Sequence, residues 1–136
     1  MSTVLYKSDY LTIEYYPEDK IMTTVWNVDS LDFTLDDFYK EIVHYIDSLQ
    51  GKEVKGFLID TRNYDFPMTD DVNTWLSENI TPAMIKAGVE KTAYVMPKEF
   101  VSRLGIELLI DKVNAKGGIV RKVFEDFDQA FEWLKK

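Results

Sequence analysis

The stretch FLIDTRNYDFPMTDDVNTW, residues 57–75, contains the junction on which the fold depends. Together with the preceding Gly it begins as a short apolar run without alternation, which is typical of a strand covered on both faces. The run ends in an acid, Asp60, and a helix is expected from about Thr69, because a Thr followed by acids is typical of a helix start. We therefore interpret the stretch as the passage from a buried strand to a covering helix.

The residues before this junction predict antiparallel strands. LTIEYY (residues 11–16) and IMTTVW (residues 21–26) both alternate between two faces. PEDK between them is typical of a turn, so the two segments are expected to form a hairpin. TVLYK (residues 3–7) is a candidate for a short edge strand ahead of this hairpin.

A helix is expected from Thr34, whose hydroxyl is a candidate N-cap. Asp36 and Asp37 follow where acids suit the positive end of the helix dipole. The apolar residues after them recur at helical spacing on one face, and Gly51 is a candidate C-terminal stop. This segment is therefore expected to be a helix with one apolar face.

The residues after the junction predict alternating helices and strands. Pro82 is expected to start a second helical segment, because proline favours the first turn of a helix. The remaining predicted elements are a strand at 92–96, a helix at 98–118 that ends at Gly-Gly, a strand at 119–124 and a final helix at 126–136 capped by Asp126 or Asp128.

This order of elements predicts the fold class. Strands alternating with helices favour parallel pairing through right-handed crossovers. We therefore predict a single α/β domain, residues 1–136. Its mixed sheet would have about five strands, with an N-terminal antiparallel hairpin followed by alternating helix–strand units and about four helices.

The composition argues against several classes of function. The 136 residues carry a net charge of −8, and nucleic acids and anionic membrane surfaces attract clustered Lys and Arg, so neither is an expected partner. No apolar run approaches the ~18 residues of a membrane span. The chain has no Cys, which excludes disulfides, thiolate metal sites and a Cys nucleophile and is consistent with the reducing cytoplasm, the location we expect.

The charge is distributed unevenly along the chain. Residues 1–80 contain 6 basic and 16 acidic residues, whereas residues 81–136 contain 10 basic and 8 acidic ones. Ordinary solvated faces explain most such patterns. The alternative is a polar molecule whose acidic face meets a basic partner.

Few residues suggest catalysis. His44, the only His, is expected in solvent on its helix, opposite the apolar stripe. The acid pairs Asp36–Asp37 and Asp70–Asp71 fall in first helical turns, where the helix dipole explains them. Glycine-rich phosphate loops and GxSxG motifs are absent from the sequence. We therefore expect no metal, no cofactor and no catalytic residue.

The strongest candidate site is the junction itself. Ligands of open α/β sheets gather beyond the carboxyl ends of the strands, where Asp60, Arg62 and Asn63 are expected. With Asp65 and Thr69 these residues form the candidate surface for a ligand or partner. The structural alternative is that Asp60 caps backbone donors, Arg62 pairs with Asp65 and Thr69 is an N-cap.

These residues, in this order of elements, resemble the STAS domain (sulfate transporter and anti-sigma factor antagonist). In that family a buried strand ends in an Asp, and the following helix begins with an Asp-Ser-Ser-Gly or Asp-Ser-Thr-Gly motif whose first hydroxyl is phosphorylated. Here Asp60 matches the strand, and Thr69 takes the place of the phosphorylated Ser. Met68, Asp70 and Asp71 depart from the motif. An incoming phosphate would meet two carboxylates, at a cost on the order of 1 kcal/mol each, so phosphorylation of Thr69 is the lesser alternative.

A closer resemblance is to small bacterial proteins grouped as STAS/SEC14-like. They share a strand followed by D-x-R-N, a Trp in the next helix, a Gly-Val turn before A-Y-V-x-P, and a Phe-rich acidic turn before A-x-x-W-L. The matching segments here are Asp60 to Asn63, Trp75, residues 87–97 and residues 123–134. The resemblance implies the SpoIIAA-like fold and no established activity.

Three functions follow as hypotheses. The first is a non-enzymatic domain that acts by protein contact, including contact with a second copy, or by binding a small ligand beside residues 60–71. The second is a small enzyme or phosphoacceptor that uses Asp60 or Thr69. The third is a carrier of an apolar ligand such as a lipid, which needs a cavity between the sheet and the helices.

Overall fold

The computed structural model describes residues 2–29, 31–65, 68–98, 100–114 and 118–136, and within these ranges the strands form one sheet whose order follows the chain. The strands are β1 (Thr3–Lys7), β2 (Leu11–Tyr16), β3 (Ile21–Asp29), β4 (Gly56–Asp65), β5 (Lys91–Val95) and β6 (Val120–Phe124). The helices are α1 (Leu35–Leu49), α2 (Asp70–Ala87), α3 (Phe100–Asn114) and α4 (Phe127–Lys135).

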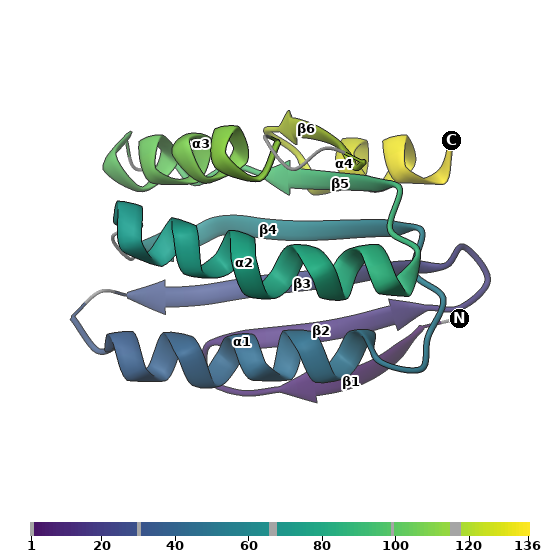
Figure 1. Cartoon of the computed structure of the whole chain (residues 1–136), viewed down its shortest axis with the longest axis horizontal. Coiled ribbons are helices and arrows are strands. Elements are labelled where there is room, and N and C mark those ends of the chain that lie inside the picture. Colours follow the sequence, from purple (N-terminus) through teal and green to yellow (C-terminus); the bar gives the residue numbers. More distant parts are fainter. Residues whose placement is uncertain (1, 30, 66–67, 99, 115–117) are drawn as a thin grey trace.

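The direction of strand pairing decides which face each helix covers. Strands β1, β2 and β3 pair antiparallel, whereas β3, β4, β5 and β6 pair parallel. Because each parallel strand adds to the same growing edge, right-handed crossovers place α1, α2 and α3 on one face. Helix α4 follows the edge strand and packs on the opposite face, against β4 and β5 (Figure 1).

The predicted α/β architecture is confirmed, including the N-terminal antiparallel hairpin and the alternating helix–strand units. The described sheet has six strands rather than about five, because TVLYK (residues 3–7) pairs with β2 as an edge strand. The four described helices match the predicted number.

Strand β4 is longer than the sequence indicated. Asp60 lies inside it, in register with Val25 of β3 and Val95 of β5. The register to β3 then shifts, which marks a bulge, and β4 continues beside β3 to Asp65. The expectation that the chain leaves the strand at Asp60 was therefore wrong. A bulge interrupts the alternation of side chains, so the polar residues after it resemble a loop.

Helix α2 also differs from the prediction. It runs from Asp70 to Ala87 as one helix with Pro82 inside it, so Pro82 does not start a second segment. Pro82 and Glu78 are both exposed, so the Glu78 carbonyl that loses its donor can be hydrated. The helix ends at Gly88, whose φ of 97° suits a residue without a side chain. For α3, residues 115–117, which include the first Gly of the predicted stop, lie outside the described residues.

Helix α1 begins as predicted, but His44 does not stand in solvent. The Thr34 hydroxyl accepts from the Asp37 backbone, and the Asp37 carboxylate accepts from the Thr34 backbone. These hydrogen bonds lower the pKa of Asp37. His44 is half-buried because β1 reaches the helix, and its ring stacks on Tyr6 with centroids 3.9 Å apart.

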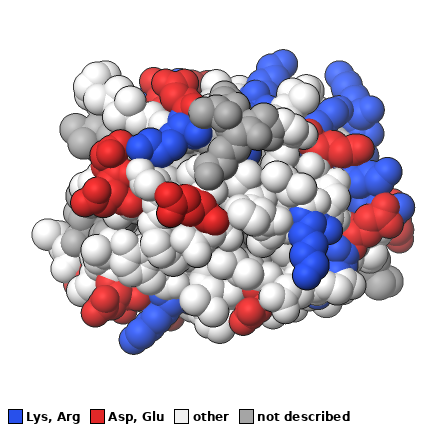
Figure 2. Space-filling model, in the orientation of Figure 1, with Lys and Arg blue, Asp and Glu red and all other residues white. Residues whose placement is uncertain are grey.

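The two acid pairs singled out in the sequence match the dipoles of their helices. They stand where α1 and α2 begin, whereas Lys86 lies in the last turn of α2. Figure 2 shows charged side chains of both signs toward both ends of this face, with a mostly uncharged area across its middle. The acid pairs thus have the structural explanation expected from the sequence.

The core lies in two parts, one on each face of the sheet. The larger part fills the space under α1, α2 and α3 and includes Trp26, Phe38 and Phe57. The smaller part lies under α4 and includes Leu58 and Val95. None of the described helices is long and apolar enough to cross a membrane.

Candidate functional site

Asp60 is a buried carboxylate that pairs with Arg62. Arg62 Nη2 lies 2.7 Å from Asp60 Oδ2, and Arg62 Nε lies 3.1 Å from Oδ1. The Arg62 backbone N–H also donates to Oδ1, at 3.1 Å. The side chain of Asp60 is 3% exposed, against 41% for Arg62. Arg62 therefore contacts the acid two residues before it, rather than Asp65 as the structural alternative supposed.

This pair lies on the α4 face of the sheet. Asp60 shares its register position with Val95, which packs under α4. The hydrogen bond with Asp60 raises the pKa of Arg62, and the charges of Asp126 and Asp128 add to the rise. Both carboxylate oxygens of Asp60 accept hydrogen bonds from Arg62, so the geometry favours a structural pair over an acid that attacks an incoming phosphate.

Thr69 occupies the N-cap of α2, on the other face of the sheet. Its hydroxyl accepts from the Val72 backbone N–H at 3.3 Å. Val72 belongs to the core under α1, α2 and α3, whereas Asp60 faces α4. The sheet thus separates Thr69 from Asp60, and these two predicted site residues do not converge.

Asn63 and Asp65 are exposed near the end of β4. With Arg62 they line a shallow groove whose other walls include Pro97 and Lys98. The predicted site is therefore divided among a buried pair, this groove and the cap of α2. The groove includes Arg62, Asn63 and Asp65 but neither Asp60 nor Thr69.

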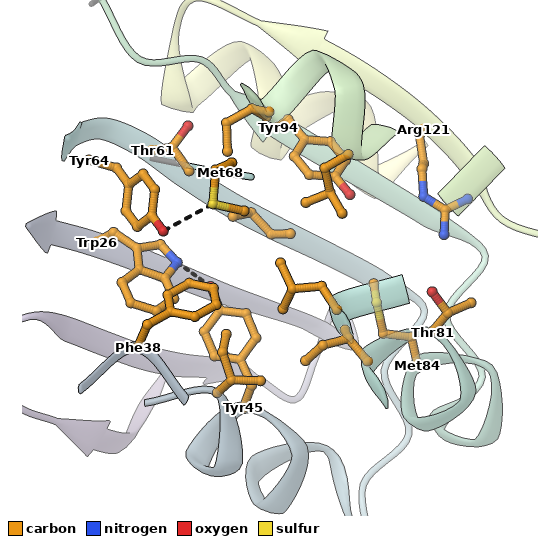
Figure 3. A pocket seen from close by; sticks show the side chains of 16 residues that line it. Trp26, Phe38, Tyr45, Thr61, Tyr64, Met68, Thr81, Met84, Tyr94 and Arg121 are labelled. Carbon is orange, nitrogen blue, oxygen red and sulfur yellow. Dashed lines mark hydrogen bonds between the residues drawn. The ribbon is translucent and has the colours of Figure 1, made fainter. Parts of the chain in front are cut away.

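An apolar cavity lies between the sheet and helices α1, α2 and α3. Its volume is about 60 Å³. Figure 3 shows side chains from both the strands and the helices around it. The lining residues are Trp26, Phe38, Ile42, Tyr45, Ile59, Thr61, Tyr64, Met68, Leu76, Ile80, Thr81, Met84, Tyr94, Ile106, Leu109 and Arg121.

A chain of hydrogen bonds begins at Trp26 and Tyr45, which line one end of the cavity. Trp26 Nε1 donates to the Tyr45 hydroxyl, which donates to Thr24 Oγ1 at 2.8 Å. Thr24 in turn donates to the Leu58 carbonyl at 3.0 Å. Burial raises the pKa of Tyr45, so the hydroxyl keeps its proton. The polar groups at this end are thus paired within the protein, and the surface they present to the cavity is aromatic.

The other end of the cavity carries the polar lining. Thr81 of α2, Tyr94 of β5 and Arg121 of β6 lie there, on three separate elements. Figure 3 shows the Tyr94 hydroxyl directed to the side on which Arg121 lies. Arg121 Nη1 donates to the Ile119 carbonyl at 3.2 Å. A cation and two hydroxyls therefore border this end of the cavity.

Buried hydroxyls beside this end have no hydrogen-bond partner among the described residues. Ser77 lies one helical turn before Thr81, and its Oγ is unpartnered. Thr92 lies in register with Arg121, and its Oγ1 is likewise unpartnered. Buried polar atoms are usually paired, so such atoms often mark a place for water or a ligand.

The wall near the start of α2 depends on a close contact between α3 and Met68. A Cβ on Gly105 would lie 2.8 Å from the Cβ of Met68, so only glycine permits this approach. The Tyr64 hydroxyl contacts Met68 Sδ at 3.3 Å from the sheet side. Met68 is thereby held against the cavity by both layers.

His44 lies far from the cavity. Its ring stacks on Tyr6, on the edge of the sheet opposite β6. Across residues 2–29, 31–65, 68–98, 100–114 and 118–136, no three His, Asp or Glu side chains are placed to hold a metal ion.

The sequence analysis named none of the residues at the polar end of the cavity. Arg121 follows the apolar residues Ile119 and Val120 in a predicted strand, where a cation facing a covered side is unusual. Thr81 and Ser77 are buried polar residues on one face of α2. The sequence could therefore have drawn attention to Arg121 alone, because no sequence pattern connects it with Thr81 and Ser77.

A scan against models of known protein families, a search of curated proteins and a search of solved structures each returned no match.

Proposed function

We propose that this protein is a non-enzymatic binding protein that holds a small apolar molecule in the cavity under α1, α2 and α3. The observation that carries the proposal is the cavity of about 60 Å³ with its largely aliphatic and aromatic lining. At roughly 15 Å³ for each water, this is room for several waters, yet an apolar lining offers them few hydrogen bonds. An apolar ligand would contact the lining and displace that unfavourable water.

The proposal favours the third hypothesis from the sequence over the other two. Asp60 pairs with Arg62, and Thr69 accepts from the Val72 backbone. These contacts give both residues a structural role that needs no catalytic or phosphoacceptor function. Contact of another protein with the groove at Asn63 and Asp65 stays a prediction. Our proposal keeps the cytoplasmic location and the STAS-like assignment, the latter supported by consecutive βα crossovers on one face.

A substitution that fills the cavity tests the proposal. Leu109 lines the cavity and is buried, whereas Leu108, its neighbour on α3, is 53% exposed and lies outside it. Leu109→Phe should reduce the affinity for octanol, a neutral probe, by about tenfold or more in calorimetry, because the added ring occupies the space of the ligand. Leu108→Phe is the matched control and should bind octanol like the wild type.

Thermal unfolding separates loss of the cavity from loss of the fold. A ring that fills empty space should leave the melting temperature of Leu109→Phe close to that of the wild type. If wild-type protein does not bind octanol, or if a folded Leu109→Phe binds it unchanged, the proposal is wrong.

A further inference from the structure

Arg121 brings a positive charge to the cavity from the edge of the sheet. It lies on β6, in register with Thr92 of β5, and its side chain is partly buried. Lys122, the next residue, turns to the opposite face, where its Nζ lies 5.4 Å from the ring centre of Phe124. Arg121 and Lys122 therefore carry the same charge to two different faces of one strand.

Hydroxyl donors stand beside the guanidinium of Arg121. Burial raises the pKa of Tyr94, and the charge of Arg121 and a hydrogen bond with it oppose that rise. Thr81 adds a buried hydroxyl from α2. A group at this end would meet a cation and two hydroxyl donors from three elements, which is the donor set that recognises an oxyanion.

The shape of the cavity indicates how the rest of such a ligand would lie. Its lining runs from Trp26 on β3 to Arg121 on β6, which are three strand spacings apart, or about 14 Å. The free volume is only about 60 Å³, so a ligand that touched both ends of this lining would have to be slender. An unbranched chain meets that requirement better than a ring system.

We propose that the ligand is an alkyl carboxylate, with its head at Arg121, Tyr94 and Thr81 and its chain directed to Phe38 and Trp26. This inference rests on the proposed function and names the chemical class of its ligand. The planar guanidinium suits a carboxylate, whose two oxygens match its fork of donors. An ammonium head would be repelled by the same charge.

Calorimetry with matched probes tests the head group without any mutation. Octanoate should bind wild-type protein about tenfold or more tightly than octanol, because a charge-assisted hydrogen bond replaces a neutral one. Octylamine should bind more weakly than octanol. Affinity should rise roughly fourfold for each added methylene from hexanoate to octanoate, as expected for a chain buried in an apolar passage.

Substitutions at the polar end of the cavity test where the carboxylate binds. Arg121→Met keeps most of the side-chain length and should bring octanoate down to the affinity of octanol, whereas Lys122→Met, the matched control, should leave both affinities unchanged. Tyr94→Phe should reduce octanoate binding in the same direction, by several-fold. It provides a second test if Arg121→Met does not fold.

The outcomes separate this inference from the proposed function. If octanoate and octanol bind equally, or if octyl phosphate or octylamine binds more tightly than octanoate, the carboxylate assignment is wrong while the apolar cavity stands. If Arg121→Met and Lys122→Met weaken octanoate equally, recognition by Arg121 is wrong. If none of the probes binds, the proposed function is wrong and this inference is lost with it.

Discussion

Two arginines of the sheet differ in what they contact. Arg62 lies against Asp60, and its Nη2 is 2.7 Å from a carboxylate oxygen. Arg121 lines an apolar cavity beside the hydroxyls of Tyr94 and Thr81. Arg62 pairs with an acid two residues away in the sequence. Arg121 lies beside hydroxyls from other strands and helices, which come near it only when the chain folds. The comparison separates a charge that stabilises the fold from one that we propose recognises a ligand.

The largest effect on stability should come from Arg62. Arg62→Met leaves the Asp60 carboxylate buried with only a backbone donor, so the free energy of unfolding should fall by about 1–3 kcal/mol in urea denaturation. Octanoate affinity should not change, because the pair lies on the α4 face. A folded Arg62→Met variant that loses octanoate binding would reverse the roles assigned to the two arginines.

A smaller effect should come from Thr69, whose hydroxyl caps α2. Thr69→Ala should lower the free energy of unfolding by about 1 kcal/mol, whereas Thr69→Asp, which is also a good N-cap, should stay near the wild type. The same denaturation experiment measures both variants. Equal destabilisation by Ala and Asp would contradict the capping role and favour a function for the hydroxyl itself.

The smallest effect on stability should come from Arg121. Its guanidinium donates to the Ile119 carbonyl, and its side chain is partly exposed. Arg121→Met should lower the free energy of unfolding less than Arg62→Met does, because it leaves the buried Asp60 carboxylate with its partner. If this variant is destabilised more than Arg62→Met, the charge at Arg121 is structural and the comparison fails.

Local patterns in the sequence predicted much of the fold. The alternation in β2 and β3, the caps at Thr34 and Thr69 and the apolar run of β4 each depend on residues within a few positions of one another. Such patterns act through the backbone nearby, so they are visible without a structure. The α/β order of the elements followed from them.

The parts that the sequence did not predict depend on contacts between distant residues. Because of the bulge in β4, the last five residues of that strand lack the alternation of a strand and resemble a polar loop. Pro82 is tolerated inside α2 because Pro82 and the Glu78 carbonyl group lie at exposed positions. His44 is half-buried only because β1 lies beside α1. The cavity arises from the way strands and helices pack, and no local pattern records an unfilled volume.

Amide chemical shifts during a titration with octanoate test the central claim most directly. The account predicts that the largest shifts fall on residues around the cavity, such as Ile59, Ile106 and Arg121, and that they saturate. It also predicts small shifts at Asn63, Asp65 and Thr69, which form the surface that the sequence favoured. Shifts confined to that surface, or no saturable shifts at all, would contradict a ligand in the cavity.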